Sequence, residues 1–87
     1  MNLTTLVTKN DKQVIRIYQI CCFEQPSEEQ LKWWLKVHAV DVDDEICYER
    51  VLSFDTINLY LMEDLPLVEK FPEKDPLPKI KIREFHP

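Results

Sequence analysis

The stretch Pro26–Val40 reads PSEEQLKWWLKVHAV and contains the clearest structural signal in the chain. Pro26 ends a preceding strand, Ser27 is a favourable N-cap residue, and Gln30 follows three positions later, which is a capping-box pattern. The apolar residues after it recur at helical spacing. We therefore predict a helix from about Glu28 to about Ala39, with a main apolar stripe of Leu31, Trp34, Leu35 and His38.

A second apolar stripe makes the hydrophobic arc of this helix unusually wide. It consists of Trp33, Val37 and Val40. Adjacent helical residues point about 100° apart, so Trp33 and Trp34 do not face the same way. Trp34 belongs to the core, whereas Trp33 either packs beneath the C-terminal arm or is an exposed anchor for a partner.

Two predicted strands precede the helix, at residues 3–8 and 13–24. The linker Lys9–Lys12 is rich in turn-forming residues, which favours a β-hairpin. Both faces of the second strand are largely apolar, as in a central strand. A helix is the alternative, because Val14, Ile17, Tyr18 and Cys21 also match a 3.6-residue period.

A second hairpin is predicted after the helix, at residues 45–54 and 56–63, where apolar residues alternate. The stretch 56–63 also fits a helix that begins at Asp55. Four prolines make residues 66–78 extended and loop-like, and Lys79–Arg83 then alternates like a short edge strand. This proline-rich arm either pairs with its own sheet or adds a strand to a partner.

The predicted fold class is therefore α+β. A chain of 87 residues forms a single domain. We expect an antiparallel sheet in β-β-α-β-β order with one helix packed on a face. Residues 1–65 form the compact part, and residues 66–87 form the proline-rich arm with its short strand, packed on the same domain.

Composition excludes several classes of site. The chain contains no glycine, and phosphate-cradling loops need glycine, so we expect no nucleotide cofactor. The three cysteines form no even-numbered disulfide framework, which favours a reduced thiol state. The N-terminal residues show no secretory signal, and the apolar runs are too short to span a bilayer. We expect a cytoplasmic protein with no membrane partner.

Metal binding and catalysis are not expected either. The acidic run after the helix lacks the glycine and the spaced glutamate of a calcium loop. The cysteines and histidines lack the paired spacing of zinc ligands, and no motif marks a Cys–His nucleophile. We therefore predict no catalytic residue, no metal ligand and no cofactor.

Charge is the most informative feature for function. Residues 41–64 contain eight acids and one base, a net charge of −7, against −5 for the whole chain. Such a surface repels nucleic-acid phosphates and attracts basic surfaces. We therefore expect no direct nucleic-acid binding. The small basic strand that contains Lys79, Lys81 and Arg83 is an exception to the acidity of the chain. The alternative is a solvated face that keeps the protein soluble.

These features favour a small acidic inhibitor or antagonist that docks on a basic surface of a target protein, such as a nucleic-acid-binding enzyme. Phage-encoded antagonists and immunity proteins often have this physical character, and a phage-encoded chain would act in the host cytoplasm. The alternative is a non-catalytic accessory subunit of a larger complex or an obligate homodimer. The predicted partner-binding residues are Trp33, Asp41, Asp43, Asp44, Glu45, Tyr48 and Glu49.

Overall fold

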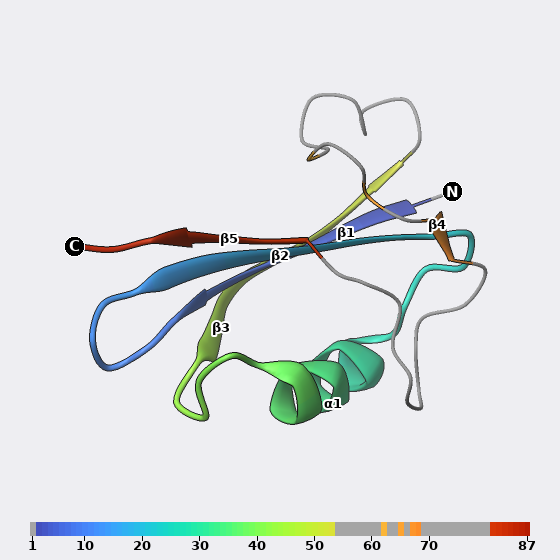
Figure 1. Cartoon of the computed structure of the whole chain (residues 1–87). Coiled ribbons are helices and arrows are strands. Elements are labelled where there is room, and N and C mark those ends of the chain that lie inside the picture. The colour runs from blue at the N-terminus through green and yellow to red at the C-terminus, as the bar shows by residue number, and fades with distance from the viewer. Residues whose placement is uncertain (1, 54–61, 63–64, 66, 69–80) are drawn as a thin grey trace.

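The computed structural model describes residues 2–53, 62, 65, 67–68 and 81–87. In these residues the strands form one twisted sheet and the helix lies beneath it (Figure 1). The chain is thus a small α+β domain with a mainly antiparallel sheet, as the sequence predicts. The elements in chain order are β1 (Asn2–Lys9), β2 (Ile15–Cys22), α1 (Glu28–His38), β3 (Glu45–Ser53), β4 (Leu67–Val68) and β5 (Lys81–Phe85).

β1 and β2 form an antiparallel hairpin whose register runs from Asn2 opposite Cys22 to Lys9 opposite Ile15. In the connecting turn, the side-chain oxygen of Asn10 accepts hydrogen bonds from the backbone N–H groups of Lys12 and Val14, both at 3.0 Å. Asparagine stabilises turns in this way. The strand prediction for this region is therefore correct, and the helical alternative is wrong.

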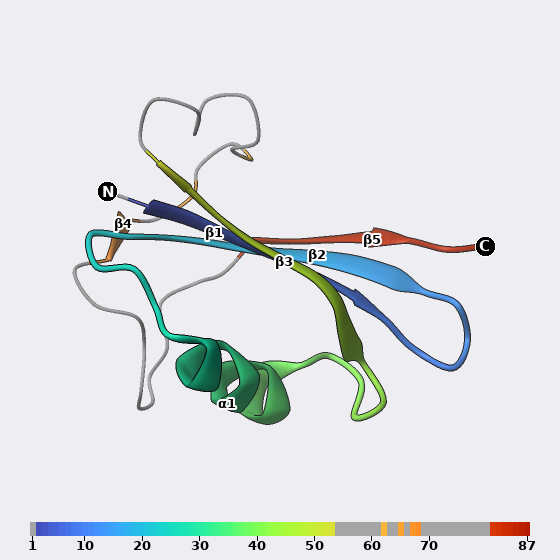
Figure 2. The ribbon, with the colours of Figure 1, turned by 180° about the vertical axis from the view of Figure 1, so that it is seen from behind.

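β2 is the strand with the most neighbours. One edge of β2 pairs with β1, which pairs in turn with β3, and a register shift lies between Val7 and Thr8 of β1. The other edge of β2 is shared. β5 pairs with its first half in antiparallel orientation, and β4 pairs with Cys21 and Cys22 in parallel orientation. Figure 2 shows β5 running along β2 from the other side of the molecule.

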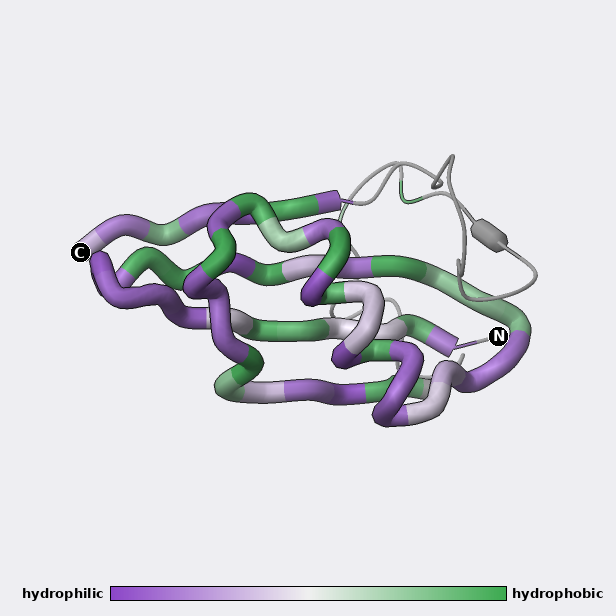
Figure 3. The backbone as a smooth tube through the Cα atoms, turned by 90° about the horizontal axis from the view of Figure 1, so that it is seen from below, coloured by the Kyte–Doolittle hydropathy of each residue, from purple (hydrophilic) through white to green (hydrophobic). Residues whose placement is uncertain are grey.

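The helix begins with the predicted capping box. Ser27 Oγ accepts a hydrogen bond from the Gln30 N–H at 3.1 Å, and the Gln30 side chain accepts one from the Ser27 N–H at 2.8 Å. These two bonds satisfy N–H groups that have no partner within the helix. Figure 3 shows α1 crossing the strands obliquely on its face of the sheet.

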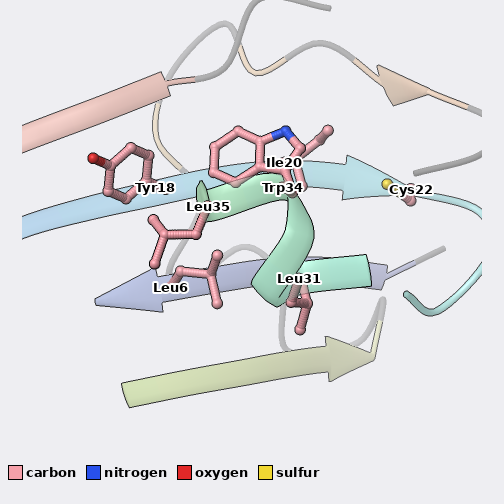
Figure 4. Close-up of a cluster of buried hydrophobic side chains, with 7 residues drawn as sticks. All are labelled: Leu6, Tyr18, Ile20, Cys22, Leu31, Trp34 and Leu35. Carbon is pink, nitrogen blue, oxygen red and sulfur yellow. The ribbon is translucent and has the colours of Figure 1, made fainter. Parts of the chain in front are cut away.

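The main core lies between α1 and the sheet (Figure 4). Tyr18 and Trp34 meet edge to face, with 5.6 Å between their ring centroids. His38, which was predicted on the same stripe, is half-buried and lies 5.5 Å from the Trp34 ring. The buried side chains of this core are Leu6, Tyr18, Ile20, Cys22, Leu31, Trp34 and Leu35.

The opposite face of the sheet, which we call the second face, is covered over only part of its length by described residues. Leu3, Cys21 and Leu52 form a small buried cluster there, and Leu65 packs against it. The backbone N–H of Met62 donates a 3.0 Å hydrogen bond to the Gln19 side chain, which extends this cover to the next row of the sheet. Beyond Gln19, towards the β1–β2 turn, no described element lies over the second face.

The structure leaves part of the predicted organisation untested. The predicted strand at residues 56–63 and the proline-rich segment 66–78 lie almost entirely outside the described residues. The strand predicted at Lys79–Arg83 is present at Lys81–Phe85, and it pairs with the protein's own β2. Among the described residues, no helix combines the length and the apolar content needed to cross a membrane.

Candidate functional site

The acidic loop after α1 folds back onto a buried arginine of β2. Arg16 Nη1 donates hydrogen bonds to both carboxylate oxygens of Asp44, at 2.7 and 2.9 Å, and Nη2 lies 2.7 Å from Asp41 Oδ2. The Arg16 side chain is 6% exposed, and that of Asp44 is fully buried. Tyr18 also donates its hydroxyl proton to Asp44, at 2.8 Å. Two of the predicted docking residues, Asp41 and Asp44, are therefore bound to a buried arginine of the domain.

A third carboxylate reaches the same guanidinium from β5. Arg16 Nε donates to Glu84 Oε1 at 2.7 Å. This bond is the main reason why the pKa of Arg16 is raised above its ordinary value, and the bonds to Asp44 and Asp41 act in the same direction. The bond from Arg16 is likewise the main reason why the pKa of Glu84 is lowered. Arg16 thus joins β2, the loop after α1 and β5 in one charged cluster.

The remaining acid of the loop also has a structural contact. Asp43 Oδ2 accepts a 3.2 Å hydrogen bond from the backbone N–H of Asp11 in the β1–β2 turn. Asp41 accepts a further hydrogen bond from the Asn10 side chain, at 3.1 Å. The loop and the turn are therefore held against each other by polar contacts, while Asp41 and Asp43 stay half-buried.

The other predicted docking residues lie elsewhere. Glu49 is opposite Leu6 and so faces α1, where its charge acts on Lys32. Tyr48 and Glu45 are opposite Val7 and Lys9, which places them on the second face. The structure thus brings Asp41, Asp43 and Asp44 together, and it distributes Glu45, Tyr48 and Glu49 over both faces of β3.

The three loop carboxylates converge closely enough to suggest a cation site, with ligand atoms within 4.8 Å of one another. However, both oxygens of Asp44 are already bound by Arg16, and one of them also by Tyr18. Arg16 therefore supplies the positive charge that a metal ion would bring, and we assign the cluster a structural role.

The two cysteines of β2 are poor candidates for a nucleophile. Burial raises the pKa of the Cys22 thiol to about 11, and it raises the pKa of Cys21 as well. A nucleophilic cysteine needs the opposite shift, because the thiolate is the reactive form. The third cysteine, Cys47, is exposed, and its thiol donates to the Val7 carbonyl oxygen at 3.1 Å.

Exposed apolar side chains also follow one another along the second half of α1 and the loop after it. Trp33 is 40% exposed, and Val37, one turn later, is 51% exposed. Val40 and Val42 follow in the loop, at 52% and 106%. We call these four residues the helix-end surface. Beside it lies a groove of about 470 Å³, lined by Lys32, Leu35, Lys36, Val37, Ala39, Val42 and Asp44.

Sequence reasoning missed Arg16 and Val42. A signal for Arg16 was present, because a single arginine among Val14, Ile15 and Ile17 in a strand that is apolar on both faces must be buried. A buried arginine requires carboxylate partners, and residues 41–45 contain the densest run of them in the sequence. Val42 lies between acids and gives no comparable signal.

The comparisons with known proteins identify no family for this chain. No protein-family model matches the chain, and searches of curated proteins and of solved structures found no match.

Proposed function

We propose that this protein is a non-catalytic domain that binds a partner protein through the helix-end surface. The observation that supports the proposal is the exposure of four large apolar side chains, 40% to 106%, on one helix turn and the loop after it. Aromatic residues at such surfaces often provide much of the binding energy, and a continuous apolar patch is a common mark of an interaction site. The geometry favours an accessory or adaptor role.

The chemistry of the groove indicates what the partner would present. Leu35, Ala39 and Val42 supply apolar walls, while Lys36 stands at the rim and forms no ion pair with any described residue. Lys32, also at the rim, is bound by Glu28 at 2.8 Å. A partner segment with an apolar side chain next to a carboxylate would complement both features.

The test uses a photo-crosslinking amino acid in place of Trp33 and, as a control, in place of Phe23, which is 54% exposed at another site. We expect an adduct with one partner from position 33 only. Val37→Asp in the same chain should abolish the adduct, and Lys36→Glu should reduce it. Equal crosslinking from positions 23 and 33, or an adduct that survives Val37→Asp, would refute the proposal.

Self-association is tested in parallel. If the partner is a second copy of the chain, sedimentation of the pure protein shows a concentration-dependent dimer, and Val37→Asp returns it to a monomer. If the protein is a monomer at all concentrations, the partner of the helix-end surface is a different protein.

A second candidate function is the acidic antagonist. One observation favours it: Glu45, Tyr48 and Glu49 are all exposed on β3, and the outer edge of β3 pairs with no other described strand. An exposed edge can accept an added strand, and glutamates on it would select a basic one. Binding of this kind weakens as salt rises, mostly through slower association.

Two variants separate the candidates. Glu45→Lys with Glu49→Lys should abolish salt-sensitive binding to a basic target and leave the crosslink at position 33 intact. The reverse pattern, with loss through Val37→Asp alone, supports the helix-end surface. In both cases we propose that the protein works in the cytoplasm without a cofactor, and that the arm of residues 66–87 packs on the same domain.

A further inference from the structure

The part of the second face that no described element covers, which we call the half-face, has a regular composition that follows from the strand register. One row across the sheet is Tyr48 on β3, Val7 on β1, Ile17 on β2 and Arg83 on β5. The next row, nearer the β1–β2 turn, is Glu45, Lys9, Ile15 and Phe85. Side chains opposite each other in neighbouring strands lie on the same face.

Positive charge borders this half-face. Lys9 and Arg83 lie within the two rows, and both side chains are exposed. Arg50 and Lys81 occupy the ends of the adjoining row, opposite Thr5 and Gln19. Among the described residues whose side chains share these rows, Lys9, Lys81 and Arg83 stand against one acid, Glu45. The nearby acids Asp41, Asp44 and Glu84 are bound by Arg16 on the α1 side of the sheet.

Two aromatic rings occupy the same half-face. Tyr48 is 46% exposed and Phe85 is 47% exposed. They lie on the outer strands, with β1 and β2 between them, roughly 16 Å apart by the spacing of strands and residues. Val7, Ile15 and Ile17 between them are half-buried, so they form an apolar floor between the two rings.

The size of the half-face limits the occupant. Four strands and two rows measure about 19 Å by about 14 Å. That is roughly a third of the ~800 Å² that each partner buries in a standard protein–protein interface. A narrow anionic chain fits this area better than a globular surface. Unpaired nucleotides offer both a phosphate for the basic rim and a flat base for each exposed ring.

We infer that this half-face binds single-stranded nucleic acid. The phosphates lie against Lys9, Lys81 and Arg83, and unpaired bases stack on Tyr48 and Phe85. The inference goes beyond the proposed function, because it concerns the face opposite α1 and uses none of the residues of the helix-end surface. It also reverses the expectation, drawn from overall acidity, that the protein has no direct nucleic-acid partner.

The test measures fluorescence anisotropy of a labelled oligothymidylate at low salt and as salt is raised. We expect saturable binding that weakens with salt. Replacing Lys81 and Arg83 with alanine should lower the affinity and reduce the slope of log affinity against log salt by about 1.4, the value for two phosphate contacts on a single strand. Tyr48→Ala and Phe85→Ala should each weaken binding roughly tenfold with little change in slope.

Matched controls exclude a general charge effect. Lys32→Ala with Lys36→Ala removes the same charge from the helix side and should leave binding unchanged. A labelled duplex should bind more weakly than the single strand, because paired bases are not free to stack on the rings. Oligoglutamate, which carries charge without bases, should not compete at equal charge concentration.

Several outcomes overturn the inference. No binding at low salt does so directly. Equal loss in the helix-side control shows non-specific attraction, and tighter binding of oligoglutamate assigns the half-face to an acidic protein instead. Circular dichroism of each variant confirms the fold, and the milder Phe85→Leu, which keeps an apolar side chain, should still weaken binding.

Discussion

Arg16 and Asp44 face each other beneath the sheet through two hydrogen bonds of 2.7 and 2.9 Å, with both side chains almost completely removed from solvent. The pair is separated by 28 positions in the sequence. It connects the N-terminal hairpin to the loop that leaves the helix.

Asp44→Asn should destabilise the domain by about 3 kcal/mol, because it leaves a buried guanidinium without the one carboxylate that is itself fully buried beside it. The measurement is the free energy of unfolding from urea denaturation. Glu84→Gln is the matched control, since it also removes a carboxylate from Arg16 but at a side chain that is 38% exposed. Its effect should be less than about 1 kcal/mol. If both substitutions lowered the free energy of unfolding equally, burial of Asp44 would not be the reason for its larger effect.

Alkaline pH should destabilise the protein through Tyr18. Burial is the main reason why the pKa of Tyr18 is raised to about 12, and the hydrogen bond to Asp44 adds to the shift. The folded state therefore binds more protons than the unfolded state between about pH 10 and about pH 12, so stability falls as pH rises through this window. Urea midpoints measured across the window should decrease.

The Tyr18→Phe variant isolates this effect. Cys22, whose pKa is raised to about 11, contributes a loss of the same sign from about pH 9 upwards, and it is unchanged in the variant. The variant should therefore lose less stability than the wild type between about pH 10 and about pH 12. The same loss in both proteins would show that Tyr18 titrates at its ordinary pKa.

Thiol reactivity should distinguish the three cysteines. Cys47 is exposed, whereas Cys21 and Cys22 are buried in β2 and have raised pKa values. A colourimetric thiol reagent should therefore modify one thiol quickly in the native protein and the other two only after denaturation. Cys47→Ser should remove the fast phase. Rapid reaction of a second thiol would indicate that the C-terminal half of β2 opens readily.

Thr8→Val should stabilise the protein by about 1 kcal/mol, measured by urea denaturation. Thr8 is fully buried, and its hydroxyl oxygen has no hydrogen-bond partner among the described residues. Replacing a buried polar group that lacks a partner with an apolar group of the same shape removes a desolvation cost. Thr5→Val is the control, because Thr5 Oγ1 accepts a 3.2 Å bond from Gln19, and this substitution should be neutral or destabilising.

Local patterns in the sequence were sufficient to predict the N-terminal hairpin, the helix and its capping box. These features depend on neighbouring residues: Asn10 on Lys12 and Val14, and Ser27 on Gln30. The acidic cluster was predicted as an accessible surface because its counter-charge, Arg16, comes from a distant strand. The sheet register that places Tyr48 and Phe85 on one face is equally non-local. Composition therefore described the charge of the chain correctly but not where each charge lies.

The shared edge of β2 has a consequence for biosynthesis. Glu84, which completes the contacts of Arg16, comes 68 positions later in the chain. Until β5 has been made, residues 15–19 of β2 lack their partner along this edge, and Arg16 lacks one of its three carboxylates. An incomplete nascent chain thus presents an open strand that holdase chaperones can recognise. Translation pauses between the codons for β2 and those for β5 would prolong that interval, and faster synthesis would shorten it.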